Sequence, residues 1–553
     1  MLAISSLSTN AFATCFPEGK YQNIVKRYAD VLLQHARDVY GPIHTPLFID
    51  TINPHTYEPY VWEIDPNEPV VSTYGQPSKQ IMANFLFMQN ILVTLNELSK
   101  LTGNPHYRNE AARCGAYALK YLKDEHGLIH CGKHATYDAL SDQKLGHNGK
   151  PHFFYFNTGC FGAWPFLYEI DPSRVNRHIE QVWNVTINQP IYWKRLEWNL
   201  HPVYGKPPYR LPWDQVELIE EDVKVPFKTQ RAVVYPQMAA DLMYSALVYS
   251  QQRGSDQRAW QAGRAILKRF MDARDSKTEL SPSSYAFHTR HTSWAEYSGA
   301  TKARDLLGIP FFIKLAETAD HEHDGALIRQ FAIDEVKTLI KYKLIPGTNR
   351  YYPTVKLDGT PLGKPQIIDE GLIWSIAKAY RLTGDAKIFN ALRSIMMAFD
   401  CGDIGTSAGK DVNLNLCSPI DVNIYPEKDQ NIKAGFMVHA FVELYRKAFE
   451  VQGKLEAIPY LEFAAKLADK VIGKTYVNGL FARRPNAKWA RTASMIPIAL
   501  LDLEAAAKGI ELNKESVFVR SYVYRFTRKQ NRKPNDNYHD WAIYNATVER
   551  KNQ

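Results

Sequence analysis

The sequence predicts an all-α protein in which helix pairs close into a ring, an (α/α)7 toroid. The first observation is a turn pattern that recurs along the chain, best seen at Leu101-Thr-Gly-Asn-Pro-His-Tyr107 and Leu382-Thr-Gly-Asp385. Its starts lie near residues 101, 171, 252, 319, 382 and 452, so the repeat is about 70 residues long. The second is that each repeat contains two helical stretches, one of them more apolar. The third is that strand signals are limited to short loop hairpins, such as Arg350-Tyr-Tyr-Pro-Thr-Val355.

The two kinds of helical stretch predict an outer and an inner ring. A more polar stretch follows each of the six turns, and another at Tyr21–Tyr40 precedes them, which makes seven. More apolar stretches lie at Ile81–Leu101, Met238–Gln251, Gly371–Leu382, Lys433–Glu450 and Ser494–Ala507. Units of two helices cannot bury their apolar faces alone, so they must stack on neighbours. Seven outer and seven inner helices give the (α/α)7 ring, and six pairs are the alternative if one end is irregular.

The repeat also predicts a single domain, although chains of this length often hold several. We expect residues 14–520 to form the toroid. Residues 1–13 are interpreted as the remnant of an export signal, because Ala11 and Ala13 fit a small-residue cleavage site. Residues 521–553 form a basic C-terminal segment that includes Arg525-Phe-Thr-Arg-Lys-Gln-Asn-Arg-Lys533. A periplasmic or secreted protein is therefore expected, with a cytoplasmic location as the alternative.

Composition narrows the class of partner. The chain has 67 Lys and Arg against 58 Asp and Glu, a net charge of +9, which favours an anionic partner. No apolar run approaches the roughly 18 residues of a membrane span. No Walker loop, zinc-finger spacing or helix-turn-helix pattern is present, so a nucleic acid is not expected as partner. We expect a monomer that binds an acidic polymer.

No two of the six cysteines form a Cys-x-x-Cys motif, which argues against a cysteine-based metal site. In an oxidising compartment Cys114 could pair with Cys131, or Cys401 with Cys417. Buried free thiols are the alternative for both pairs.

The functional face of such a ring is formed by the loops that join its helices. The long loops at 124–160, 188–232, 276–297 and 344–370 are rich in polar and aromatic residues. Single residues in them have simpler explanations. A loop histidine is usually a surface or hydrogen-bonded residue, and Asp369-Glu370 suits the first turn of a helix. Trp164, Trp198 and Trp294 fit a protein core as well as a platform for sugar rings.

Five short motifs, in order along the chain, resemble those of the family 2 pectate lyases. They are Tyr40-Gly-Pro-Ile-His-Thr-Pro-Leu-Phe-Ile-Asp-Thr-Ile-Asn53, Leu101-Thr-Gly-Asn-Pro-His-Tyr107, Gly127-Leu-Ile with Gly132-Lys-His134, Tyr168-Glu-Ile-Asp-Pro172 and Leu196-Glu-Trp-Asn-Leu-His201. The resemblance covers most of the chain. It implies an (α/α)7 barrel and cleavage of polygalacturonate by β-elimination, assisted by a transition metal such as manganese.

The resemblance also implies site residues. Two histidines and a glutamate hold the metal in that family, and an arginine beside the second histidine is the base. His134 and His201 match the two metal-binding histidines. The expected glutamate falls among Phe153, Tyr155, Phe156 and Asn157, and Leu200 stands where the arginine is expected. Two routes therefore stay open, one with a metal and one without.

A route without metal needs other groups for the same chemistry. The uronate carboxylate must be neutralised by hydrogen-bond donors, and a base of lowered pKa must remove the C5 proton. For this we expect Tyr155, His201, Tyr204 and Arg210 as catalytic residues. The expected substrate-binding residues are Asn157, Trp164, Arg231, Arg290 and Arg491, since the arginine fork matches a carboxylate bidentately.

Two other functions fit the same sequence. One is a glycoside hydrolase on the same ring, with Asp369, Glu370, Glu197 or Glu296 as general acid and base. The other is a degenerate lyase that binds acidic glycan without cleaving it. Leu200 and the absence of the expected glutamate support this alternative.

Overall fold

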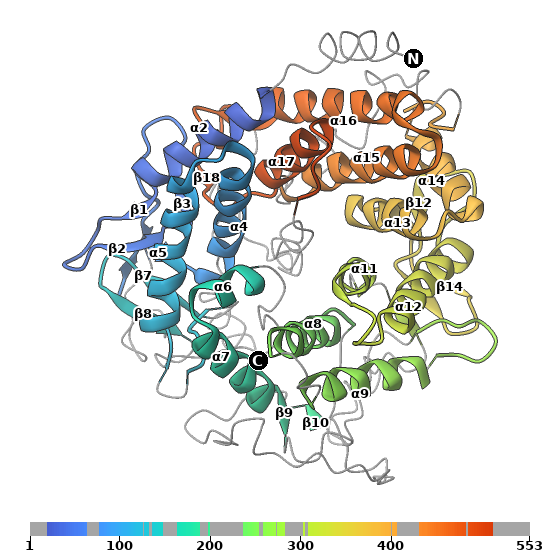
Figure 1. The fold of residues 1–553 in the computed structure, drawn as a ribbon, viewed down its shortest axis with the longest axis horizontal. Helices are drawn as coiled ribbons and strands as arrows, with labels where there is room; N and C mark the ends of the chain where they lie inside the picture. The colour runs from blue at the N-terminus through green and yellow to red at the C-terminus, as the bar shows by residue number, and fades with distance from the viewer. Residues whose placement is uncertain are drawn as a thin grey trace, which may run out of the picture.

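In the computed structural model, two concentric rings of helices surround a common axis (Figure 1). The structure describes residues 19–63, 77–124, 127–131, 135–146, 163–188, 197–198, 236–253, 258–272, 274–281, 302–304, 308–399, 401–405, 431–482 and 485–512. The inner helices of this part are α4 (Phe85–Thr102), α6 (Trp164–Ile170), α8 (Pro236–Gln252), α11 (Gly308–Thr318), α13 (Glu370–Thr383), α15 (Asn431–Gln452) and α17 (Ile496–Ala507). The outer helices are α2 (Lys20–His35), α5 (Pro105–Tyr121), α7 (Pro172–Thr186), α9 (Arg258–Asp272), α12 (Gly325–Thr338), α14 (Ala386–Ala398) and α16 (Lys454–Thr475).

The described residues therefore contain seven helix pairs, which confirms the (α/α)7 prediction over the alternative of six. Each inner helix packs against the outer helix that follows it in the chain, except α17, which packs against α2. The first and last described helices thus form the seventh pair and close the ring. The domain limits predicted at residues 14 and 520 lie outside the described residues and stay predictions.

Hydrophobicity decides which helix lies inside. Every residue from Phe85 to Ser99 of α4 is buried, and so is every residue from Ile496 to Ala506 of α17. On outer α2 only one stripe is buried, which includes Tyr21, Val25 and Leu32. A helix that is apolar all round has neighbours on every side, whereas an amphipathic helix has only one face to bury.

The recurring turn pattern is a helix stop followed at once by a helix start. Gly103 ends α4 and Gly384 ends α13, each with the left-handed backbone (φ 69° and 68°) that glycine adopts without strain. The next residue caps the outer helix. The Asn104 side chain accepts a hydrogen bond from the amide of His106 at 3.0 Å, and Asp385 accepts one from Lys387 at 2.8 Å. These short turns all join an inner helix to an outer one.

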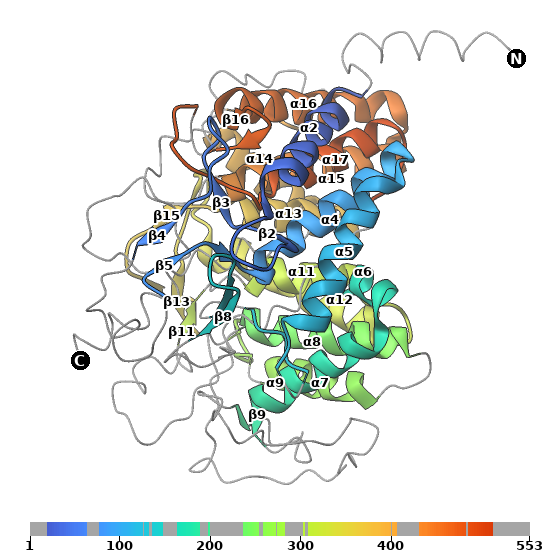
Figure 2. The same cartoon turned by 90° about the vertical axis from the view of Figure 1, so that its left-hand side faces the viewer.

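The connections in the opposite direction, from outer to inner helix, are long and carry the strands. In the described residues these are β1 (Arg37–Asp38), β2 (Thr45–Phe48), β3 (Thr51–Ile52), β4 (Trp62–Glu63), β5 (Lys79–Gln80), β6 (Met82–Ala83), β7 (Ala135–Asp138), β8 (Gln143–Gly146), β9 (Ile187–Asn188), β10 (Glu197–Trp198), β11 (Lys302–Arg304), β12 (Arg350–Tyr351), β13 (Thr354–Lys356), β14 (Pro361–Leu362), β15 (Gln366–Ile367), β16 (Tyr476–Val477), β17 (Leu480–Phe481) and β18 (Ala490–Arg491). They form small antiparallel sheets, and most of them lie beside one end of the helical ring (Figure 2).

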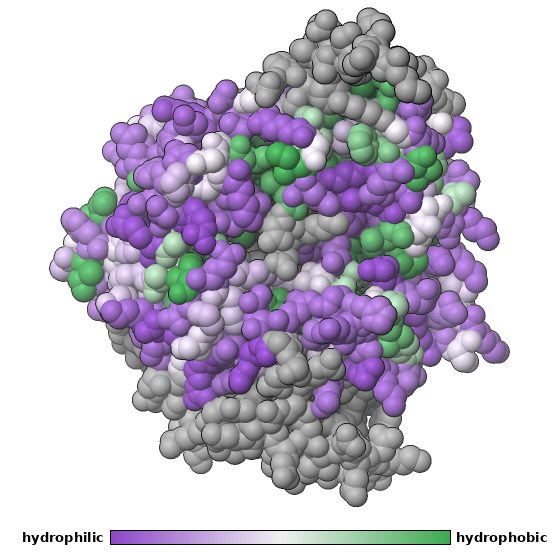
Figure 3. Space-filling model, in the orientation of Figure 1, coloured by the Kyte–Doolittle hydropathy of each residue, from purple (hydrophilic) through white to green (hydrophobic). Residues whose placement is uncertain are grey.

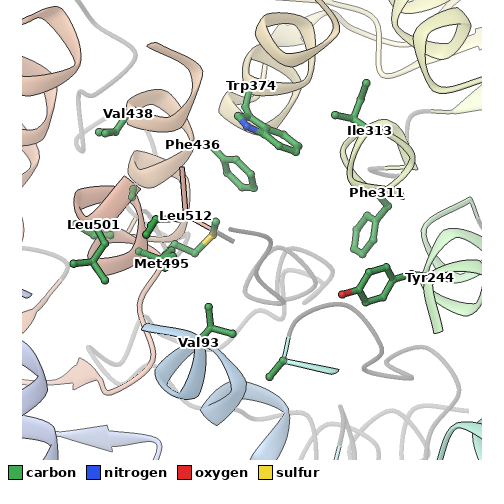
Figure 4. Close-up of a cluster of buried hydrophobic side chains, with 14 of the residues drawn as sticks. Val93, Tyr244, Phe311, Ile313, Trp374, Phe436, Val438, Met495, Leu501 and Leu512 are labelled. Atoms are coloured by element: carbon green, nitrogen blue, oxygen red, sulfur yellow. The ribbon is translucent and has the colours of Figure 1, made fainter. Parts of the chain in front are cut away.

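The inner helices direct large apolar side chains toward the middle of the ring. Figure 4 shows Val93, Tyr244, Phe311, Trp374 and Phe436 there, contributed by five different inner helices. All five side chains are buried. The surface seen in Figure 3 is mostly hydrophilic, and its hydrophobic residues lie in small separate areas.

Buried ion pairs also join the inner helices. Lys378 of α13 contacts Glu317 of α11 and, at 2.8 Å, Glu443 of α15. Asp502 of α17 accepts a hydrogen bond from Arg446 of α15 at 2.5 Å and contacts the Nδ1 atom of His439 at 2.8 Å. Burial alone disfavours the charge on Lys378, but the two glutamates outweigh it and raise the pKa of Lys378.

The described cysteines include both free thiols and a disulfide-bonded residue. Cys114 and Cys131 are both buried thiols, which agrees with the second of the two alternatives for this pair. Cys401 is part of a disulfide, and Cys417, the partner that the spacing suggests, lies outside the described residues. No helix in the described part of the chain has the length and apolar character needed to cross a bilayer.

Candidate functional site

The candidate site is the face of the ring that carries the strands (Figure 2). The long connections all lead into inner helices, so the amino-terminal ends of those helices meet at this face. A helix amino-terminus carries a partial positive charge. Several of them converging on one face favour an anionic ligand there, in agreement with the net charge of +9.

Most of the predicted site residues lie outside the described residues. These are His134, Tyr155, Asn157, His201, Tyr204, Arg210, Arg231 and Arg290. Their roles, and the metal or metal-free route that depends on them, stay predictions. Trp164 and Arg491 are the two predicted site residues that the structure describes.

The strand that follows His134 lies at the functional face. This strand, β7, pairs with β6, with Met82 opposite Asp138 and Ala83 opposite Tyr137. Strand β6 leads directly into Asn84, whose side chain caps inner helix α4 by accepting the amide of Leu86 at 3.0 Å. Through this pairing, the segment that begins at Ala135 lies next to the amino-terminal end of inner helix α4.

His130, from the same histidine-rich segment, has a structural role. It is buried, and its Nε2 atom lies 2.5 Å from the carbonyl oxygen of Leu145 on β8. Burial lowers its pKa to about 4, so the ring is neutral near pH 7 and donates that bond. His130 therefore holds the β7–β8 hairpin in place.

Trp164 lies in the core at the start of α6. Its side chain is 1% exposed, and its ring is tilted against that of His178 with 5.1 Å between centroids. His178 in turn accepts a hydrogen bond from the amide of Ile129 at 2.9 Å. With its ring covered, Trp164 offers no open face for a sugar in this arrangement.

Arg491 lies at the functional face, and its substrate-binding role stays a prediction. It is in β18, directly before inner helix α17, and pairs with Thr51 of β3. Its guanidinium carbon lies 5.9 Å from the centre of the Phe87 ring in the first turn of α4. The side chain is partly exposed. Arg491 thus stands where two inner helices begin, with an aromatic face that orients its guanidinium.

Sequence reasoning missed an aromatic group next to Arg491. Tyr60 packs edge-on against Trp489 at 4.8 Å between ring centroids and against Trp62 at 6.1 Å. All three side chains are partly exposed. The available signal was the spacing of Tyr60 and Trp62, two residues apart, because residues at that spacing share one side of a strand.

The acidic pair Asp369-Glu370 has the structural role that its position suggested. The Asp369 side chain is 1% exposed and accepts the amide of Gly371 at 3.0 Å, which caps inner helix α13. Glu370 is the first residue of that helix. Of the other two candidate carboxylates, Glu197 is in β10 and Glu296 lies outside the described residues.

Within the described residues, no group of three or more His, Cys, Asp or Glu side chains is placed to hold a metal ion. The two histidines predicted as ligands, His134 and His201, lie outside that part of the chain. A metal therefore stays a prediction.

Several solved structures are similar to this chain at low identity. An α-1,6-mannanase from Salegentibacter sp. is 9% identical, with 88% of this chain and 99% of that chain covered and a TM-score of 0.39. A cellobiose 2-epimerase from Spirochaeta thermophila is 11% identical, with coverage of 88% and 98% and a TM-score of 0.40. An α-mannanase from Bacteroides thetaiotaomicron is 9% identical, with coverage of 90% and 98% and a TM-score of 0.41.

A family model described as periplasmic pectate lyase matches residues 45–304 and 312–521. The two matched segments span most of the chain and include the ring from β2 to α17. They also contain all the predicted site residues, both those that the structure describes and those that it does not. The chain therefore belongs to the family of periplasmic pectate lyases, carbohydrate-active enzymes of an acidic polysaccharide.

Proposed function

We propose that this protein is a lyase that cleaves polygalacturonate or its oligosaccharides by β-elimination. The observation that carries the proposal is the family match over residues 45–304 and 312–521. The position of Arg491 supports it, because a partly exposed guanidinium at the functional face suits the carboxylate of a uronate.

The reaction makes three demands on the chain's residues. Donors must hold the uronate carboxylate so that negative charge can develop on it when the C5 proton leaves. A base takes that proton, the C4–C5 double bond forms, and the C4–O bond to the leaving sugar breaks. The leaving oxygen then takes up a proton. We assign the donor role to Asn157 and the proton transfers to the set of His201, Tyr155, Tyr204 and Arg210. Arg491 is assigned to the carboxylate of a flanking uronate.

A divalent metal held by His134 and His201 would neutralise the carboxylate more strongly than hydrogen-bond donors do. Two protein ligands rarely suffice for tight binding, so this route needs a third ligand from the same loops. The route without metal relies on Asn157 and the arginines for the same task.

The hydrolase alternative has lost one of its candidates. Asp369 is almost fully buried and its carboxylate caps α13, which makes it a poor general acid for a bound sugar. The non-catalytic binder remains an outcome of the experiment that tests the proposal.

The test is incubation of the protein with polygalacturonate while near-ultraviolet absorbance is followed, because only elimination produces an unsaturated uronate. We expect absorbance to rise, and His201→Ala to lower the rate by about 10²-fold or more. His106→Ala is the matched control, since His106 is exposed on outer helix α5. Added Mn²⁺ and EDTA separate the two routes.

Two results would contradict the proposal. Reducing ends that appear without absorbance would identify a hydrolase, and tight binding without any product would identify a binder.

A further inference from the structure

Next to Arg491, the structure brings together two aromatic segments from opposite ends of the sequence. Strand β3 pairs with β18 on one side, and Ile52 forms a bridge to Pro59 on the other. The amide of Tyr60 also donates to the carbonyl oxygen of Thr51 at 3.0 Å. The two-stranded sheet of β18 and β3 thus carries residues 59–60 along the other edge of β3.

The two sides of this sheet differ in character. Ile52 and Ala490 are paired with each other and both are buried in the core. The neighbouring pair, Thr51 and Arg491, must point to the other side, because side chains alternate along a strand. By the same alternation Tyr60 and Trp489 share the side of Arg491, and their 4.8 Å ring contact agrees with this placement.

We call the group formed by Tyr60, Trp62, Lys488, Trp489 and Arg491 the aromatic–basic patch. The Lys488 ammonium lies 5.5 Å from the centre of the Trp489 ring. Tyr60 stands edge-on to both tryptophans, with interplanar angles of 87° and 89°. Such packing fixes the ring orientations before any ligand arrives, which lowers the entropy cost of binding.

The patch extends outward from the ring. Arg491 is its inner end, over Phe87 in the first turn of α4. Trp489 lies two residues earlier, about 7 Å farther along an extended chain. Two acidic side chains of the described residues lie on the neighbouring edge. Glu63 is 3.3 Å from Lys79 in an exposed ion pair, and Glu58 accepts a hydrogen bond from the Thr56 hydroxyl at 3.1 Å. Lys488 itself is exposed.

We propose that the aromatic–basic patch binds a polyuronate chain outside the point of cleavage, as an accessory subsite for long substrates. The rings offer flat apolar surface to sugar rings, while Lys488 and Arg491 match the carboxylates that such a chain carries at every residue. This proposal rests on the proposed function for the identity of the ligand. A single-stranded nucleic acid, which also combines flat rings with negative charge, is the other occupant that the test must separate.

The subsite predicts an effect that depends on substrate length. Trp62→Ala and Trp489→Ala are each expected to weaken binding of polygalacturonate about fivefold or more, measured by retardation in native gels that contain the polymer. Turnover of trigalacturonate should stay unchanged, because a short substrate need not reach the patch. The matched control is Tyr121→Ala, since Tyr121 is exposed on outer α5 with Lys120 over its ring at 4.8 Å.

A second variant tests the charge and leaves every ring in place. Lys488→Glu should weaken binding of polygalacturonate, more at low than at high ionic strength. It should leave binding of the fully methyl-esterified, uncharged polymer unchanged. Because Lys488 is exposed, this variant is expected to fold even if a tryptophan variant does not.

The outcomes separate the two proposals. Wild-type affinity for polygalacturonate in folded Trp62, Trp489 and Lys488 variants would overturn the subsite, whether or not the wild type cleaves. Binding that depends on Trp489 in a protein that forms no unsaturated product would support the subsite and refute the lyase. Binding of a single-stranded oligonucleotide through Trp489, with no affinity for polyuronate, would overturn the subsite as stated.

Discussion

At the residue scale, His130 shows what burial does to a titratable group. Its backbone amide donates to the carbonyl of Leu122, just after α5, and its buried ring bonds to the carbonyl of Leu145 on β8. Burial lowers its pKa from 6.5 to about 4, with Lys144 adding to this effect. In the unfolded chain the same histidine titrates near its ordinary value.

This shift predicts a dependence of stability on pH. Between pH 6.5 and 4 the unfolded state binds a proton at His130 that the folded state does not. The contribution of the neutral ring is therefore complete above pH 6.5 and is lost as the pH falls toward 4, by up to about 1.4 kcal/mol per pH unit. His130→Gln should make urea unfolding less sensitive to pH in this window. His106→Gln, at an exposed position, should not; equal slopes in His130→Gln and wild type would contradict the assignment.

At the element scale, the inner helices are held by charge as well as by apolar contact. Lys378 is 1% exposed and lies between Glu317 and Glu443, which belong to the two neighbouring inner helices. Charges buried in this way need their partners, because the low-dielectric interior penalises any that is left alone. Removing one of these three side chains should therefore lower the free energy of unfolding by more than the loss of a surface ion pair does.

Lys378→Ala is expected to lower the free energy of unfolding by about 3 kcal/mol, since each of two buried glutamates loses a cationic partner. Glu317 keeps only Lys314 at 3.4 Å, while Glu443 keeps Arg381 at 2.9 Å. The control is Lys20→Ala, which breaks a pair with Asp469 that is 36% and 45% exposed and should cost about 1 kcal/mol or less. Urea denaturation of both variants at neutral pH measures the difference. If both variants lost the same free energy of unfolding, the buried ion pairs of Lys378 would contribute no more to stability than a surface pair does.

At the scale of the whole molecule, a buried carboxylate takes part in ring closure. Glu504 of α17 is fully buried and accepts the amides of Gly19, at 2.8 Å, and Tyr21, at 3.2 Å. These amides belong to the start of α2, where helix N–H groups have no partner within the helix. The last described helix thus caps the first.

Glu504→Ala should loosen the closure rather than unfold one local element. Three amides, those of Gly19, Tyr21 and Gln22, would lose their acceptor, at a cost of about 3 kcal/mol. We expect faster hydrogen exchange in both α2 and α17, measured by mass spectrometry, while α11 and α12 keep their protection. Glu456→Ala, an exposed first-turn position of α16, is the control. Uniformly faster exchange in every helix would contradict a closure role.

Some features followed directly from local sequence. The glycine–asparagine and glycine–aspartate turns at 103–104 and 384–385 mark helix ends, because glycine suits the left-handed backbone angle and a short polar side chain suits the cap. The acidic residue Asp369 was correctly interpreted as a helix start. Trp164 shows the limit, since the same residue type fits a core and a sugar platform, and only burial distinguishes them.

The sequence by itself determined the number and order of the helix pairs and the class of protein. Helical periodicity, turn residues and family motifs are all properties of short segments, and short segments carry them whatever the chain does elsewhere. Only the tertiary structure decided that Tyr60 meets Trp489 and that Glu504 caps α2. Such contacts join residues more than 400 positions apart, and their formation depends on how the whole ring packs. No local pattern records that packing.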